Sequence, residues 1–133
     1  MLYYKLNQVK NLAGEIERLE GLRNQVEKSR DEEYKRGYYE NLKFCKNEYR
    51  RLSQEDLLEG LDLSEEEKRM AYLVYYKNVE WKDAMHKALS EGIRKKICDD
   101  ESGKLERKTL NALKKHIYKT IQVYYDYQKK KEN

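Results

Sequence analysis

The stretch LSEEEKRMAYLVYYKNVEWKDAMHKAL, residues 63–89, predicts two helices joined by a turn. Ser64 and Glu67 have the spacing of a capping box, in which the Ser hydroxyl and the Glu carboxylate each accept a hydrogen bond from the other residue's backbone N–H. The acidic residues that follow Ser64 suit the positive end of a helix dipole. Apolar side chains then recur at helical spacing as far as Tyr76. These features predict a helix over about residues 65–77.

The end of the same stretch predicts a second, shorter helix over about residues 79–89. Asn78 tolerates a turn conformation, and its side chain is expected to cap this second helix. Trp81 lies at the front of the helix, where packing of its large ring is expected to fix the angle between the two helices. Any helical bundle would use Trp81 in this way, so this residue alone indicates no function.

The chain beyond this pair of helices predicts a further short helix and then a long one. The short helix is expected over about residues 91–98, and the stretch DDESG at 99–103 is expected to be a loop. The last helix is expected over about residues 104–128. Its inward-facing positions are predicted to be Leu105 or Glu106, Leu110, Leu113, Ile117, Ile121 or Thr120, and Tyr124.

The N-terminal part of the chain carries an apolar seam whose steps alternate between three and four residues, as in a coiled coil. Its main members are Val9, Leu12, Ile16, Leu19, Val26, Leu42 and Tyr49. The polar segment at residues 29–37 divides the seam into two halves of similar length, which indicates a helical hairpin. A single long helix that forms a homodimer through the seam is the alternative. A domain boundary near Gly60 would separate residues 1–60 from a second helical domain at 61–133.

The composition favours an all-α protein. Charged residues make up 41% of the 133 residues and Pro is absent, a mixture typical of helices with solvated faces.

No apolar run is long enough for a signal peptide or a membrane span. Cys45 and Cys98 have no metal-type partners nearby, and both are expected to be free, buried thiols. A cytoplasmic protein is therefore expected.

Positive charge is concentrated at the C-terminal end of the chain. Residues 91–133 contain 12 Lys and Arg against 7 Asp and Glu, which accounts for more than the whole net charge of +4. Such a distribution is typical of a surface that meets an anionic partner. On the last helix, Asn111 could pair with adenine and Arg107 with guanine, while the lysines contact phosphates. The candidate nucleic-acid-binding residues are Arg94, Lys95, Lys96, Lys104, Arg107, Lys108, Asn111, Lys114, Lys115 and Lys119.

The order of these helices resembles region 4 of bacterial sigma factors and the small phage regulators of the late-operon and autolysin-regulator type. Tyr72, Leu73, Tyr75 and Tyr76 match the aromatic segment of that pattern, Trp81 to Met85 match its "WEEIA" positions, and Arg107, Lys108, Leu110, Leu113, Lys114 and Lys115 match its basic helix. The resemblance spans about residues 63–121. It implies a helix-turn-helix-like domain that binds double-stranded DNA, with RNA polymerase as a further partner, and regulates transcription in a phage or mobile element.

The chain departs from that pattern at three points. Bulky Met85 stands where a small residue is usual, and the Gly of the tight turn is missing after Leu89. The third departure is an insertion, IRKKICDDESG, between the Trp81 helix and the last helix. This insertion leaves open which helix would read DNA.

Enzymatic chemistry is not indicated. His86 and His116 have no carboxylate or Cys at ligand spacing, so no metal site and no cofactor are expected. No catalytic triad and no phosphate-binding glycine loop can be recognised. The alternative to DNA binding is a small helical protein, such as a phage-encoded inhibitor or adaptor, that binds another protein. The 13 tyrosines would suit such an interface, because Tyr buries area and keeps a polar tip.

Overall fold

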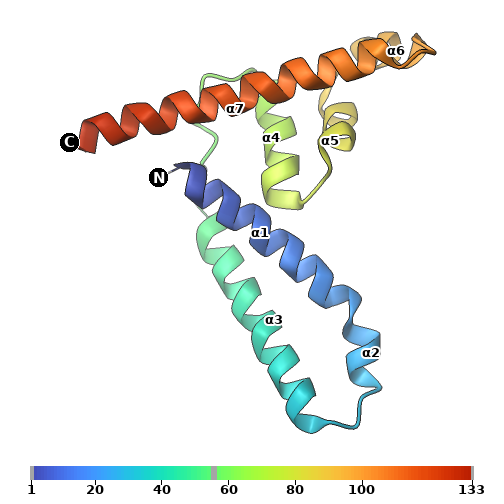
Figure 1. Ribbon diagram of the computed structural model, residues 1–133, viewed down its shortest axis with the longest axis vertical. Coiled ribbons are helices and arrows are strands. Elements are labelled where there is room, and N and C mark those ends of the chain that lie inside the picture. The colour runs from blue at the N-terminus through green and yellow to red at the C-terminus, as the bar shows by residue number, and fades with distance from the viewer. Residues whose placement is uncertain (1, 55–56, 133) are drawn as a thin grey trace.

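The computed structural model describes residues 2–54 and 57–132, with side chains placed for residues 5–54 and 57–124. The described residues form helices joined by turns and contain no β-strand, so the all-α prediction is confirmed. The helices are α1 (Leu2–Gly21), α2 (Arg23–Glu27), α3 (Glu32–Ser53), α4 (Glu65–Lys77), α5 (Trp81–Ala88), α6 (Glu91–Asp99) and α7 (Lys104–Glu132). Figure 1 shows α7 lying across the molecule, with α4 and α5 beneath it and α1 to α3 extending away.

The N-terminal helices form a hairpin in which α3 runs back along α1 (Figure 1). The chain reverses at residues 28–31, so the alternative of one long helix is wrong. Asp31 fixes the start of α3, because its side chain accepts hydrogen bonds from the backbone N–H groups of Glu33 and Tyr34 at 3.1 and 3.2 Å. The turn is therefore shorter than the predicted polar segment, and Gly37 lies inside α3.

The seam residues are packed within this single chain. Leu19, Val26 and Leu42 belong to one buried cluster, which Leu12 and Ile16 cover. Val9 and Tyr49 instead contribute to the main core. A homodimer through these same side chains would therefore require the hairpin to open.

The two cysteines differ in exposure. Cys45 is buried in the hairpin, and this burial raises the pKa of its thiol. Cys98, near the end of α6, is exposed, so the prediction that both thiols are buried is wrong for Cys98. The reason is that α6 buries only Ile97, which leaves the next side chain in solvent. Both thiols are free.

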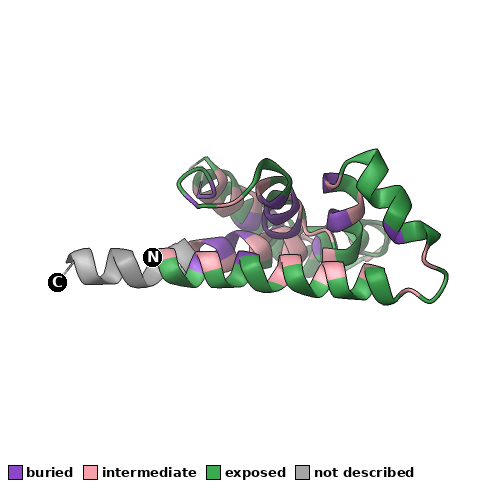
Figure 2. Cartoon of the chain, turned by 90° about the horizontal axis from the view of Figure 1, so that it is seen from above, coloured by how far each residue is buried: buried purple, intermediate pink, exposed green. Residues whose placement is uncertain are grey.

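The main hydrophobic core joins the start of α1 to α4, α5 and α7. Its fully buried members include Leu6, Val9, Met70, Met85, Ile117 and Ile121. Two of these residues, Leu6 and Val9, come from α1. The core therefore contains residues from both sides of the domain boundary that was predicted near Gly60. Figure 2 shows the other face of α7, turned away from the remaining helices, as largely exposed.

The junctions around α4 have well-defined caps. Ser64 and Glu67 form the predicted capping box, with both hydrogen bonds at 3.1 Å. Asn78 does not cap α5, contrary to prediction. It ends α4 in the left-handed conformation (φ 55°), and its side chain donates to Glu17 of α1 at 2.7 Å. Asn adopts this conformation more readily than most residues, which explains its position here.

None of the helices in the described part of the chain has an apolar stretch of the length needed to cross a membrane.

Candidate nucleic-acid interface

The outward face of α7 carries six cationic side chains on one stripe. Residues spaced three or four apart share a helix face. The buried Ile117 faces away from the middle of this stripe, and Lys114, seven residues before the buried Ile121, lies at the edge of the stripe. The stripe consists of Lys104, Arg107, Lys108, Lys114, Lys115 and Lys119, with Asn111 near its middle. All of these are exposed except Lys114, which is half-buried. We call this set the α7 stripe; it extends over about 22 Å of helix.

No carboxylate interrupts the α7 stripe. Between residues 104 and 124, the only acidic residue is Glu106, and it lies on the inward side, as one of the two predicted alternatives. Glu106 pairs with Lys82 and His86 of α5 at 3.1 and 3.4 Å, and the hydrogen bond from Lys82 is the main reason that its pKa is lowered. Within the described residues, no ion pair involves any of the six stripe cations. The stripe therefore contains no carboxylate of its own; near its start, the charge of Arg107 acts on Asp100 and helps to lower the pKa of that carboxyl.

The second predicted cluster lies on α6, which packs beside the first turns of α7 (Figure 1). Arg94, Lys95 and Lys96 are all exposed. The guanidinium of Arg94 donates to the backbone carbonyl of His86 at 3.2 Å, which ties this side chain to α5. The two lysines remain free to contact an anionic partner.

Asp100 organises the loop between α6 and α7. Its carboxylate accepts hydrogen bonds from the backbone N–H of Leu105 at 2.8 Å and from the hydroxyl of Ser102 at 2.8 Å. The bond from Leu105 is the main reason that the pKa of Asp100 is lowered. Asp100 thus fixes the start of α7, and the loop predicted at 99–103 is confirmed at residues 100–103.

An aromatic side chain that the sequence analysis did not single out lies within the α7 stripe. Tyr118 is 42% exposed, and its ring centroid lies 5.4 Å from that of Trp81. Trp81 in turn meets the edge of the buried Tyr75 ring at 6.0 Å, and Lys114 Nζ lies 5.6 Å from the Trp81 centroid. Trp81 therefore joins α4, α5 and α7. The spacing of Tyr118 from Lys114 and Asn111, four and seven residues, would have placed it on the stripe.

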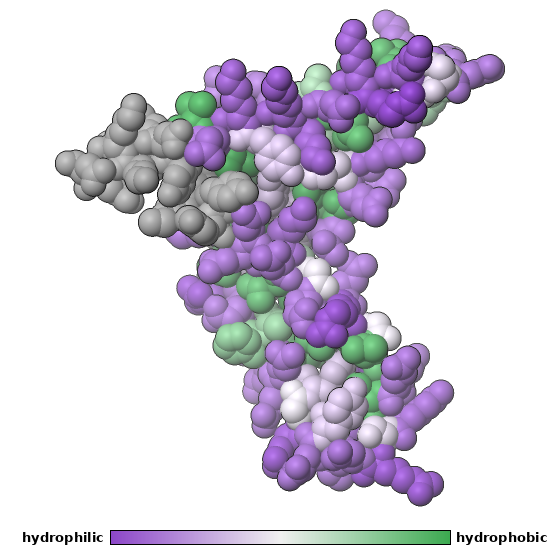
Figure 3. Space-filling model, in the orientation of Figure 1, coloured by the Kyte–Doolittle hydropathy of each residue, from purple (hydrophilic) through white to green (hydrophobic). Residues whose placement is uncertain are grey.

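The helix α5 is less suited to meet phosphates. Glu80 precedes it and Asp83 lies in its first turn, and both are exposed. These carboxylates repel anions at the helix end that would otherwise attract them. The geometry thus makes α7 better suited than α5 to meet an anionic partner. In Figure 3, hydrophilic side chains crowd along α7 on the visible face.

Both histidines are paired with carboxylates that are remote in sequence. Nδ1 of His116 donates a hydrogen bond to Glu67, and His86 lies beside Glu106. Burial alone would raise the pKa of Glu67, but the hydrogen bonds from His116 and Ser64 outweigh it and lower the pKa. Among the described residues, no group of three His, Cys, Asp or Glu side chains is placed to hold a metal ion.

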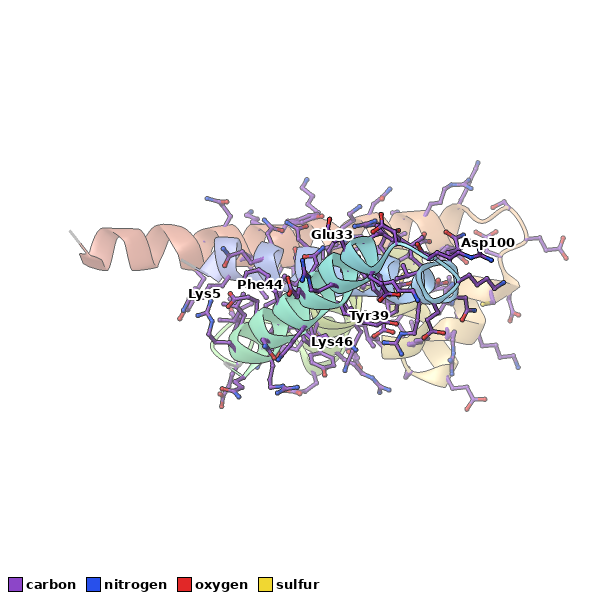
Figure 4. The ribbon with its side chains drawn as sticks, turned by 90° about the horizontal axis from the view of Figure 1, so that it is seen from below. Lys5, Glu33, Tyr39, Phe44, Lys46 and Asp100 are labelled. Carbon is purple, nitrogen blue, oxygen red and sulfur yellow. The ribbon has the colours of Figure 1, made fainter. Side chains whose placement is uncertain are left out.

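The hairpin presents exposed aromatic side chains of its own. Tyr34, Tyr39 and Phe44 of α3 are 52%, 42% and 63% exposed. Figure 4 shows Tyr39 and Phe44 on this helix.

Comparisons with protein-family models, with curated proteins and with solved structures found no match to this chain. Its function must therefore be argued from its own side chains.

Proposed function

We propose that this protein is a non-enzymatic DNA-binding protein that docks the α7 stripe onto duplex DNA. The observation that carries the proposal is the uninterrupted row of six cations on one outward helix face. If the charged residues of α7 served only to solvate the helix, both acidic and basic side chains would be expected on this face. Here Glu106, the single acidic residue between residues 104 and 124, is turned inward and paired with Lys82 of α5.

The dimensions of the stripe support duplex DNA as the partner. The major groove is about 12 Å wide and admits one α-helix. Duplex DNA carries one phosphate per about 1.7 Å of its axis, so a stripe of about 22 Å has phosphates within reach along its whole length. Asn111 lies between the cations, where its amide could form the paired hydrogen bonds that adenine offers.

The resemblance to sigma region 4 extends the proposal to biology. On that basis the protein regulates transcription in a phage or mobile element, with RNA polymerase as a further partner, in the cytoplasm. An exposed, free Cys98 suits a reducing compartment.

A second candidate function rests on the hairpin. Exposed aromatic side chains are enriched in protein interfaces, and Phe44 at 63% exposure is the most exposed of those on α3. The hairpin could therefore dock a partner protein, whether or not α7 binds DNA. In this second candidate function, the protein is a small helical inhibitor or adaptor that acts by binding another protein.

Fluorescence anisotropy with labelled duplex DNA of mixed sequence, measured from about 50 to 200 mM salt, tests the first proposal. If six phosphates are neutralised, the logarithm of the association constant should fall against that of salt concentration with a slope of about −5. Replacing Lys114 and Lys115 with Ala should reduce the steepness of this slope by about 1.8, since each lost phosphate contact contributes about 0.9.

A matched control removes the same charge elsewhere. Arg36 and Lys43 are exposed on α3 and form no ion pair among the described residues. Replacing both with Ala should leave the slope unchanged. Equal effects of the two double variants would mean that only net charge matters, and no binding at the lowest salt would refute DNA binding.

A further inference from the structure

A shallow depression on α7 surrounds Tyr118. Its lining residues are Asn111, Lys114, Lys115, Tyr118, Lys119 and Gln122. Three of the six are lysines, two are side-chain amides, and the one ring among them is Tyr118. The depression therefore combines an aromatic surface, hydrogen-bonding amides and positive charge within about two to three turns of one helix.

Tyr118 is held in place from one side. Its ring lies against Trp81 at 5.4 Å with an interplanar angle of 57°, and the Tyr75 ring supports Trp81 from behind. Trp81 is half-buried and packs against the main core, whereas Tyr118 remains 42% exposed. The ring is thus positioned by the protein while part of its surface stays available to a ligand.

We infer that Tyr118 is a stacking site for an unpaired nucleobase, with Lys114, Lys115 and Lys119 holding the flanking phosphates. The inference rests on the proposed function, because it assigns a ligand to part of the same surface. A phosphate can bind a cation or accept a hydrogen bond from a Tyr hydroxyl, but it has no flat face to stack on the ring. A base has a π-face that stacks on aromatic side chains, and its edges form hydrogen bonds with amides such as Asn111.

The inference also separates two forms of nucleic acid. In an intact duplex the bases stack on one another, so their faces are not available to Tyr118. In a single strand, or at a melted position of a duplex, a base can leave the stack. A duplex with one unpaired base should therefore bind the α7 stripe more tightly than the fully paired duplex of the same length at the same salt concentration.

Three labelled duplexes test this inference by anisotropy: one with an unpaired base in one strand, the fully paired duplex, and one with an abasic site in place of the unpaired base. The duplex with the unpaired base should bind best. Tyr118→Ala should weaken its binding by about 5- to 150-fold, the range for loss of one stacked base. Tyr118→Phe keeps the ring and should retain the affinity. Trp81 is the only Trp, so its fluorescence should change on binding of the duplex with the unpaired base and respond less to the abasic duplex.

Tyr72→Ala is the matched control, because Tyr72 is also 42% exposed and stacks on Tyr76 at 5.0 Å, but lies on α4. It should leave binding of all three probes unchanged. Equal affinity for the duplexes with the unpaired base and with the abasic site, or no effect of Tyr118→Ala, would overturn the stacking site while leaving binding by the α7 stripe intact. Failure of every probe to bind would overturn the proposed function as well.

Discussion

Replacing Glu67 should reveal how strongly α4 and α7 are joined. Glu67 is 8% exposed, completes the capping box with Ser64, and accepts a hydrogen bond from His116 of α7. It is the only buried charged residue among the described side chains. Glu67→Gln keeps the size and an acceptor oxygen but removes the charge. Glu67→Ala removes both hydrogen bonds that the carboxylate accepts, from the Ser64 backbone N–H and from His116, but keeps the bond from the residue 67 backbone N–H to the Ser64 hydroxyl.

The structure sets the size of the effect. Loss of the hydrogen bond from the Ser64 backbone N–H costs about 0.5–1.5 kcal/mol, and loss of a negative charge near a helix N-terminus about 0.3–1 kcal/mol. The bond to His116 adds little, because His116 is 53% exposed and such pairs contribute about 0–1 kcal/mol. Glu67→Ala should therefore lower the free energy of unfolding by about 1–3 kcal/mol, and Glu67→Gln by about 0.5–1.5 kcal/mol.

The effect should depend on pH in a defined direction. The pKa of Glu67 in the folded state is lower than the unfolded value, because its hydrogen bonds outweigh burial. The carboxylate therefore contributes stability above the unfolded pKa of about 4.5, and this stability is lost as the pH falls through the folded pKa. Urea unfolding at pH 6 and at pH 3, followed by Trp81 fluorescence and circular dichroism, measures the difference.

At pH 6 the wild-type protein should be more stable than Glu67→Gln, and at pH 3 the two should approach each other. His116→Ala should reduce the difference at pH 6, since it removes one of the interactions of Glu67. A difference between wild type and Glu67→Gln that is the same at both pH values would refute this reasoning. So would equal stability at pH 6.

Two further predictions concern exposure and backbone conformation. In the native protein, Cys98 should react with a thiol reagent at the rate of an exposed thiol, whereas Cys45 should react only after unfolding; mass spectrometry of the labelled peptides distinguishes them. Asn78→Ala should lower the free energy of unfolding by about 1 kcal/mol, because Ala is strained at φ 55°, while Asn78→Gly should cost less and lose only the bond to Glu17. Equal costs of Ala and Gly in urea titrations would contradict this explanation.

Local signals in the sequence predicted the ends of several helices. The capping box of Ser64 and Glu67 needs only four consecutive residues, so its geometry follows from short-range rules. The α7 stripe also follows from spacing, since Ile117 and Ile121 fix which face is buried.

Contacts between remote segments could not be predicted in the same way. The seam from Val9 to Tyr49 fits both a hairpin and a dimer. A heptad pattern shows which face of a helix is packed, but not whether the partner helix belongs to the same chain or to a second copy. The bond between Glu67 and His116 joins residues 49 positions apart, and no sequence spacing encodes it. Asn78 was placed at the wrong helix end, because Asn suits both an N-cap and a left-handed C-terminal residue.

The position of Tyr118 could have been predicted from the sequence, although the sequence analysis did not single it out. Its position on the α7 stripe follows from its spacing to Asn111 and Lys114. Its support by Trp81 does not, because the two residues are 37 positions apart and meet only when α5 packs against α7.

Lysine footprinting shows whether DNA binds to α7. The protein is treated with an amine-reactive acylating reagent with and without a short DNA, and modification of each lysine is measured by mass spectrometry. DNA should protect Lys114, Lys115 and Lys119, while Lys28 and Lys43 on the hairpin should react as before. Protection of the hairpin lysines alone, or of no lysine at a DNA concentration that saturates anisotropy, would contradict binding through α7.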